Sequence, residues 1–269
     1  MADISLIMET GALADIYEAA SENQYKAGLV LLEQLKFTPG EIVLDVGCGT
    51  GRLGVDAADL VGPHGKVTGI DPLATRIQIA SKRARENLSF LVGDALDLSI
   101  FASASFDVVY LNAVFHWLPD KARALHEFAR VLKPNGRLGI TTGSGDHPYP
   151  HEILKERVMA RERYRSYIES TKGDASLPTK KHLESLLHDA GFQCQSIFFA
   201  PHVLITKSAS EMVDFIEASS FGNFLGHLPN HLRSMARQEI EEEYEQLRTD
   251  EGIVAEATRL IVVANKIQG

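Results

Sequence analysis

The chain has 269 residues, of which 45% are hydrophobic and 23% are charged, a balance ordinary for a globular protein with a buried core. Its formal net charge is -9 and its pI is about 5.6. These values exclude a broad positive surface of the kind that binds a nucleic-acid backbone, so we expect no nucleic-acid partner.

Apolar runs in the sequence are all shorter than the roughly 20 residues that a membrane-spanning helix needs, and the first ten residues lack the pattern of a secretory signal. The two cysteines, Cys48 and Cys194, fit no metal-ligand spacing and no disulfide framework. We therefore expect a cytoplasmic protein with no membrane partner and no bound metal. The sequence carries no signal for the oligomeric state.

Helical and strand patterns alternate up to residue 142. The predicted helices are 22–35, 53–60, 74–86 and 121–131, and the predicted strands are 42–46, 66–70, 88–92, 106–111 and 137–142. This alternation predicts an α/β fold, with a doubly wound parallel sheet covered by helices on both faces.

The pattern changes after residue 142. A helical stretch containing 152–170 is followed by a helix at 180–190 and a strand at 193–199, then by a second helical stretch over 208–249 and a last strand at 259–263. The predicted division is 1–142 for the N-terminal helices and cofactor-binding half, 143–179 for a helical insertion, 180–200 for the resumed core, 201–256 for a helical lid insertion and 257–269 for the closing strand. Both insertions follow a strand, where an open α/β sheet has its ligand crevice, so we interpret them as a cover for the site.

The segment from Val43 to Gly51 carries most of the functional information. Its glycines follow a predicted buried strand directly and precede a helix, so the backbone can approach a ligand closely and the positive helix end faces that ligand. Spacing alone leaves the ligand open, because residues 49–54 also satisfy the G-x-G-x-x-G dinucleotide fingerprint.

Two carboxylates separate the alternatives. Asp45 stands near the end of the apolar strand, two residues before the first glycine. A buried charge there would repel a pyrophosphate but attract an ammonium or a sulfonium. Asp71 ends the second strand, 20 residues after Gly51, where a carboxylate can bind both ribose hydroxyls. Asp71 suits a nicotinamide dinucleotide equally well, but Asp45 does not.

Four motifs in order resemble those of the class I S-adenosylmethionine-dependent methyltransferases: residues 43–51, 69–72, 93–95 and 132–138. The resemblance covers about residues 22–142 and the closing strands. It implies a seven-stranded Rossmann-like sheet with helical lid insertions after the fifth and sixth strands, S-adenosylmethionine as cofactor and a small-molecule substrate.

The resemblance also implies cofactor contacts. Gly47, Cys48, Gly49 and Gly51 would line the amino-acid part of the cofactor, with Asp45 beneath it. Asp71 would hold the ribose, Pro72 would lie beside the adenine, Asp94 would accept from the adenine amine, and the Ala95 amide would approach the ring. The Asn112 backbone oxygen would face the cofactor ammonium, and Tyr17 and Gln24 would close over the methionine part.

The segment from Asn112 to Trp117 resembles that of trans-aconitate methyltransferase-like enzymes, and within it His116 is the candidate catalytic residue. Methyl transfer from a sulfonium needs alignment and exclusion of water, and it needs a general base only when the nucleophile starts protonated. His116 could supply that base, or it could be structural.

The insertions hold candidate specificity residues. Arg157, Arg161 and Arg165 recur at helical spacing and could face an acidic substrate, although interleaved glutamates favour a solvated, salt-bridged face. Residues 221–229 are apolar and glycine-punctuated, as in a substrate lid, and 239–245 read as an exposed helix.

Two alternatives to a small-molecule methyltransferase stay open from the sequence. A nicotinamide-dependent reductase would account for the glycines and Asp71 but not for Asp45 and Asp94. A non-catalytic S-adenosylmethionine-binding protein would account for the motifs but not for two covering insertions.

Overall fold

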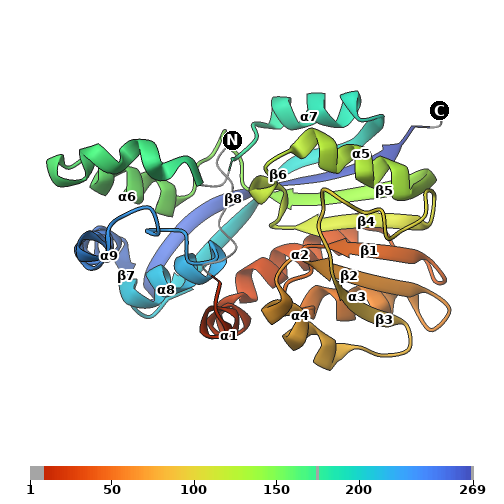
Figure 1. The fold of residues 1–269 in the computed structure, drawn as a ribbon, viewed down its shortest axis with the longest axis horizontal. Coiled ribbons are helices and arrows are strands. Elements are labelled where there is room, and N and C mark those ends of the chain that lie inside the picture. Colours follow the sequence, from red (N-terminus) through yellow and green to blue (C-terminus); the bar gives the residue numbers. More distant parts are fainter. Residues whose placement is uncertain (1–8, 174–175, 268–269) are drawn as a thin grey trace. The chain divides into compact units, whose positions relative to one another are not determined.

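The computed structural model describes residues 9–173 and 176–267, which form two compact units (Figure 1). The sheet unit comprises residues 24–146, 176–200 and 259–267, and the insertion unit comprises residues 9–23, 147–173 and 201–258. Residues 9–23, which the sequence analysis groups with residues 24–142, therefore belong with the two insertions.

The sheet has the strand order β3-β2-β1-β4-β5-β8-β6, with the two-residue β7 (Arg248–Thr249) pairing with β8. The first five strands are parallel, and β8 runs antiparallel to β5. Their bounds are β1 Ile42–Val46, β2 Lys66–Asp71, β3 Leu88–Val92, β4 Phe106–Asn112, β5 Leu132–Thr142, β6 Phe192–Thr206 and β8 Gly252–Lys266. The predicted doubly wound, seven-stranded fold is confirmed.

Helices cover both faces of this sheet within the sheet unit (Figure 1). One face packs on α5 (Lys121–Val131) and α7 (Lys180–Asp189), and the other packs on α2 (Glu22–Leu35), α3 (Arg52–Val61) and α4 (Ala74–Ala80). Successive side chains of β1 alternate between the faces, so Leu44 joins the first cluster and Val43 joins the second. Asp45 therefore lies on the side of α2 and α3.

The insertion unit has a hydrophobic core of its own. It is built from α1 (Gly11–Ala20), α6 (Pro150–Met159), the 3₁₀ segment η4 (Glu162–Gly173), α8 (Ala209–Ser219) and α9 (Asn230–Glu245). Val158, Tyr164, Ile240 and Tyr244 are among its buried residues. The two segments predicted as insertions thus fold together, along with α1.

Several predicted elements have different bounds in the structure. The helix expected over 152–170 ends at Met159 and resumes as the 3₁₀ segment η4. Strands β6 and β8 are each 15 residues long, well beyond the predicted 193–199 and 259–263, because their outer parts belong to the insertion unit. Strand β5 begins at Leu132, before the predicted start at residue 137, and it contains an irregularity where Asn135 has a φ of 63° and the register with β4 shifts.

None of the described helices combines the length and the apolar character needed to cross a bilayer.

Candidate functional site

The loop between β1 and α3 is fastened to the end of β2 by its own backbone. The N–H groups of Gly47 and Cys48 both donate to the Ile70 oxygen, at 2.7 and 2.9 Å, and the Gly51 N–H donates to the Cys48 oxygen at 2.9 Å. These amides are therefore engaged within the protein. They do not form the open cradle of N–H groups that a diphosphate requires.

Asp71 locks the same loop to the start of α4. Its carboxylate is 5% exposed and accepts from the Gly49 N–H at 3.0 Å and from the Leu73 N–H at 2.9 Å. Arg83, just after α4, donates to the Thr50 oxygen at 3.2 Å. A carboxylate predicted from the sequence as a ribose ligand is thus also the main anchor of the glycine-rich loop.

Two loop glycines are required by packing against protein side chains. Gly47 and Gly51 have φ angles of 70° and 82°, in the left-handed region that side chains disfavour. A Cβ at Gly47 would lie 2.3 Å from a Val114 methyl carbon, and one at Gly51 would lie 2.7 Å from the Phe90 ring. The sequence predicted a close approach of the loop backbone to a ligand. At Gly47 and Gly51 the backbone instead lies close to the side chains of Val114 and Phe90.

Asp45 is buried beneath the loop, at 2% exposure. Its Oδ2 atom has no hydrogen-bond partner among the described residues. Burial raises the pKa of this carboxyl to about 7, from an ordinary value of 3.8. An unpartnered buried carboxylate is costly, and a cationic ligand would relieve that cost.

Cys48 is a poor nucleophile in this setting. Burial raises the pKa of its thiol well above the usual value, and the neighbouring Asp45 and Asp71 raise it further. The thiol therefore stays protonated at neutral pH.

The side chain of Asn112, at the end of β4, joins three elements. Its Nδ2 donates to the Gln24 oxygen of α2 at 3.0 Å, and its Oδ1 accepts from Thr141 Oγ1 of β5 at 2.6 Å. The next residue, Ala113, has a φ of 59° and donates its N–H to the Thr141 oxygen. The sequence suggested a role for the Asn112 backbone only, and the part played by Thr141 was missed.

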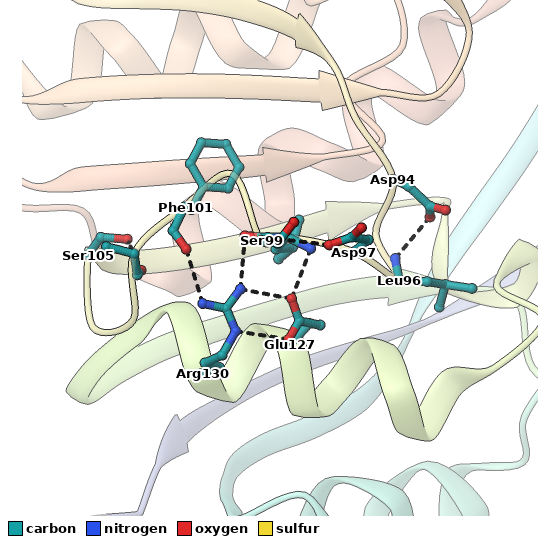
Figure 2. A network of polar contacts seen from close by, with 10 residues as sticks. Asp94, Leu96, Asp97, Ser99, Phe101, Ser105, Glu127 and Arg130 are labelled. Atoms are coloured by element: carbon teal, nitrogen blue, oxygen red, sulfur yellow. Dashed lines mark hydrogen bonds and ion pairs between the residues drawn. The ribbon is translucent and has the colours of Figure 1, made fainter.

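A polar network holds the segment after β3 against α5 (Figure 2). Arg130 donates to the oxygens of Leu98 and Phe101 at 2.8 and 3.0 Å and pairs with Glu127, whose carboxylate accepts from the Leu98 N–H at 2.9 Å. Asp94 opens this segment and accepts from the Leu96 N–H at 2.9 Å. Sequence analysis found Asp94 and Ala95 but missed the Glu127–Arg130 pair, which binds the backbone at Leu98 and Phe101 in the same segment.

An open depression lies beside this network, lined by Leu96, Asp97, Ser99, Arg123 and His126 among others. It includes no residue of the glycine-rich loop, so we do not assign it to the cofactor.

His116 lies in the 3₁₀ turn η3 (Phe115–Trp117) that follows β4. It is 7% exposed, and its Nδ1 lies 3.0 Å from Thr142 Oγ1 of β5. Its backbone oxygen accepts from the Ser176 N–H at 2.9 Å. The Trp117 ring lies 5.1 Å from the His116 imidazole. His116 is therefore held through its side chain by Thr142 and through its backbone by Ser176.

The arginines of the first insertion contact protein carboxylates. Arg161 pairs with Glu239 and Glu243 of α9 at 2.6 and 2.7 Å, Arg163 pairs with Glu239 at 3.0 Å, and Arg157 pairs with Glu243 at 2.8 Å. For Arg157 and Arg161 the structure shows the salt-bridged alternative and not a face free for an acidic substrate. Arg165 donates to the Ala160 oxygen at 3.3 Å. The expectation of an exposed helix at 239–245 is wrong, because Glu239, Ile240 and Tyr244 are buried.

The predicted cofactor residues of the sheet unit converge on one edge. Parallel strands β1, β2, β3 and β4 end there, and Asp45, the loop, Asp71, Asp94 and Asn112 follow from those strand ends. Pro72 is exposed at the same edge, directly after β2, whereas Ala95 is buried. Gln24 is the first residue of the sheet unit and lies on α2, while Tyr17 lies on α1 in the insertion unit.

No cluster of three or more potential metal-ligating side chains occurs among the described residues.

A loop fastened by Asp71 and underlain by Asp45, whose Oδ2 lacks a hydrogen-bond partner, fits a ligand with a ribose and a cationic amino-acid end, as S-adenosylmethionine has. The family model described as a methyltransferase domain matches residues 37–191. The chain belongs to the class I S-adenosylmethionine-dependent methyltransferases. S-Adenosylmethionine is the methyl donor of this family, which argues against the nicotinamide-dependent alternative.

Individual relatives agree with the family. The chain is 32% identical over 180 residues to nocamycin O-methyltransferase of Saccharothrix syringae, covering 65% of this chain and 62% of that protein. It is 34% identical over 169 residues to demethylmenaquinone methyltransferase of Lactococcus lactis, covering 57% and 66%. The chain thus spans less than two thirds of the length of these two relatives.

A solved methyltransferase structure from Bacillus halodurans superposes with a TM-score of 0.62, at 18% identity, over 90% of this chain and 99% of that one. At this identity the likeness shows the fold alone.

Proposed function

We propose that this chain transfers the methyl group of S-adenosylmethionine to an oxygen or carboxylate of a small molecule. The observation that supports the proposal most is the convergence of Asp45, the Asp71-anchored loop and His116 on neighbouring strand ends. The name of the S. syringae relative, an O-methyltransferase, supports an oxygen acceptor. The predicted cytoplasmic location and lack of nucleic-acid or membrane partners stay predictions.

The cofactor contacts implied by the family resemblance belong to this proposal. Asp71 would hold the ribose while it fastens the loop, Asp94 would meet the adenine amine, and Asp45 would offset the charge of the amino-acid end. Asn112 would face that end through its backbone, which its side chain fixes through Gln24 and Thr141. Tyr17 would close over the methionine part, and residues 221–229, between α8 and α9, would line the acceptor entrance.

Bound S-adenosylmethionine supplies an electrophilic methyl group on a sulfonium, and the protein has to align the acceptor and exclude water. A carboxylate acceptor is already a nucleophile and needs no base. A hydroxyl acceptor has to lose a proton, and a base then speeds the reaction by about 100-fold or more.

His116 is the candidate for that base. If Nδ1 donates to Thr142 Oγ1, the neutral imidazole carries its lone pair on Nε2, the form that can accept a proton. The contact with Thr142 and the Ser176 bond to its backbone fix the ring, as a positioned base requires.

Matched acceptors test this assignment. S-Adenosylhomocysteine formation is followed with pairs of small molecules that differ only in carrying a carboxylate or a hydroxyl. We expect His116→Gln to slow transfer to hydroxyl acceptors by about 100-fold and transfer to carboxylates by no more than a few-fold. His126→Gln, a change at an exposed histidine of α5, is the matched control.

Equal rates for His116→Gln and the parent chain with a hydroxyl acceptor would remove His116 from the chemistry. If S-adenosylhomocysteine binds tightly but no acceptor in the panel is methylated, the non-catalytic binding protein becomes the better account.

A further inference from the structure

Asp45 faces a second buried polar side chain across the sheet. Strands β1 and β4 are parallel neighbours, and their register places Asp45 opposite Tyr110. Both residues lie on the sheet face that packs against α2 and α3, because Tyr110 shares its cluster with Val43 and Leu53. Tyr110 is 0% exposed, so its hydroxyl cannot reach water.

Neither side chain has a complete set of hydrogen bonds. Asp45 Oδ2 and the Tyr110 hydroxyl are both buried without a well-formed partner. The hydroxyl is nevertheless close enough to Asp45 to lower the pKa of the carboxyl, against the larger opposing effect of burial. Two incompletely bonded groups side by side in a packed core are costly to keep, which argues for a function of the pair.

The groups that surround Asp45 and Tyr110 favour binding of a cation. In the described part of the chain, the titratable groups that act on it are Asp71 from β2, Cys48 from the loop and Asp56 from α3. All of these are acidic. The nearest basic residue of α3, Arg52, lies over the Tyr25 ring at 4.3 Å. None of the titratable groups that act on the pair is basic, so a bound cation would be attracted to Asp45.

We propose that Tyr110 is a positioning residue that orients Asp45 and favours its ionised form, so that binding of the cationic amino-acid end of the cofactor releases one proton from Asp45 to the solvent. The inference rests on the cofactor assignment.

The direction of the linkage follows from the pKa of Asp45. Burial raises this pKa to about 7, so the free protein carries the proton on Asp45 in acidic solution. A cation favours the carboxylate, so the bound protein has lost that proton. Cofactor affinity should therefore rise about tenfold per pH unit below pH 6 and level off above pH 8. Without the Tyr110 hydroxyl the carboxyl holds its proton to higher pH.

Calorimetric titration with S-adenosylhomocysteine tests this without any turnover. Titrations between about pH 5.5 and pH 8.5, in two buffers of different ionisation enthalpy, give the affinity and the number of protons released. The parent chain should release close to one proton at the acidic end and none at the alkaline end. Tyr110→Phe should move this curve upward by about one pH unit, with affinity within about twofold of the parent at the alkaline end.

Three controls sharpen the result. Asp45→Asn should bind with no proton release at any of these pH values. Tyr244→Phe, which removes the hydroxyl of a buried tyrosine in the insertion unit, should reproduce the parent curve. 5′-Methylthioadenosine, which lacks the amino-acid end, should release no proton from the parent chain.

If the parent chain binds S-adenosylhomocysteine with no proton release, or if Tyr110→Phe reproduces its curve, the inference is overturned. No binding of S-adenosylhomocysteine to the parent at any pH would instead overturn the cofactor assignment. If Tyr110→Phe does not fold, the carboxyl ¹³C shift of Asp45 decides the matter. It should titrate near neutral pH in the free parent chain and stay that of a carboxylate when the ligand is bound, and an Asp45 that is ionised throughout in both states would contradict the inference.

Discussion

Asp45 in the sheet unit and Glu239 in the insertion unit are both buried carboxylates, at 2% and 9% exposure, and they differ in their surroundings. Glu239 pairs with Arg161 and Arg163 at 2.6 and 3.0 Å. Asp45 has Tyr110 opposite it and Asp71 nearby, and its Oδ2 has no partner in the described structure. A paired buried acid can stabilise the fold that provides its partners, whereas an unpaired one lowers stability unless a ligand pairs it.

This comparison separates two kinds of charged cluster that look alike in a sequence. The arginines of the first insertion suggested a substrate site, and their partners are α9 glutamates. At the strand ends, Asp45 Oδ2 has no hydrogen-bond partner among the described residues, and Asp71 accepts from the Gly49 and Leu73 N–H groups. The incompletely hydrogen-bonded Asp45 is therefore a better indication of a candidate binding site than the charge density of the arginine cluster.

The largest effect should come from Asp71→Ala. The change removes the acceptor of both the Gly49 and the Leu73 N–H groups, so the loop loses its anchor together with the proposed ribose contact. We expect the affinity for S-adenosylhomocysteine to fall at least about 100-fold, as for loss of two charge-assisted hydrogen bonds. Calorimetry measures this, with Asp71→Asn, which keeps one acceptor oxygen, as the milder matched variant. Affinity within threefold of the parent for the alanine variant would contradict this role.

Asp45→Asn should make the free chain more stable at alkaline pH than at acidic pH, relative to the parent chain. The carboxyl has a pKa of about 7 in the folded chain and an ordinary value of 3.8, so between these values the folded state keeps a proton that the unfolded state loses. Stability therefore falls as pH rises from 4 to 7 and stays low above that. The asparagine variant does not titrate, so at pH 8 it should gain up to about 4 kcal/mol over the parent, with little gain at pH 4. Thermal unfolding of both chains at the two pH values measures this, and an equal difference at both would contradict it.

Glu239→Gln should lower the stability of the chain, by less than Asp45→Asn raises it. It removes the charge that pairs with Arg161 and Arg163, so the insertion unit should lose about 1–3 kcal/mol. Because Arg161 is about one third exposed, solvent screening places the expected value at the lower end of this range. Denaturant unfolding gives the loss, and the affinity for S-adenosylhomocysteine should stay unchanged. A stability gain would remove the contrast between the two acids.

Local patterns explain why much of the sheet unit could be predicted. The apolar run of β1, Asp45 and the glycines are signals within a few residues of each other, Asp71 follows at the end of the next strand, and strand alternation supplied the topology. What could not be predicted depends on register between distant strands. Asp45 and Tyr110 are recognisable as neighbours only once β4 is aligned with β1.

The ion pairs of the insertion unit could not be predicted from the sequence for the same reason. Arg161 and Glu239 are 78 positions apart, and only the packing of α6 and α9 makes them partners. The Glu127–Arg130 pair likewise reads as an ordinary helical spacing, and its bonds to Leu98 and Phe101 follow from how α5 packs on the segment after β3 (Figure 2). Hydrophobic periodicity and composition identify the buried face of a helix or strand, but they do not predict which residue will pair with a buried charged side chain.

The most direct measurement of the central claim is a parallel calorimetric titration of the intact chain with S-adenosylhomocysteine and with NADH. We expect one molecule of S-adenosylhomocysteine to bind per chain, this binding to be lost in Asp71→Ala, and NADH to give no heat of binding. Tight binding of NADH with no response to S-adenosylhomocysteine would contradict it.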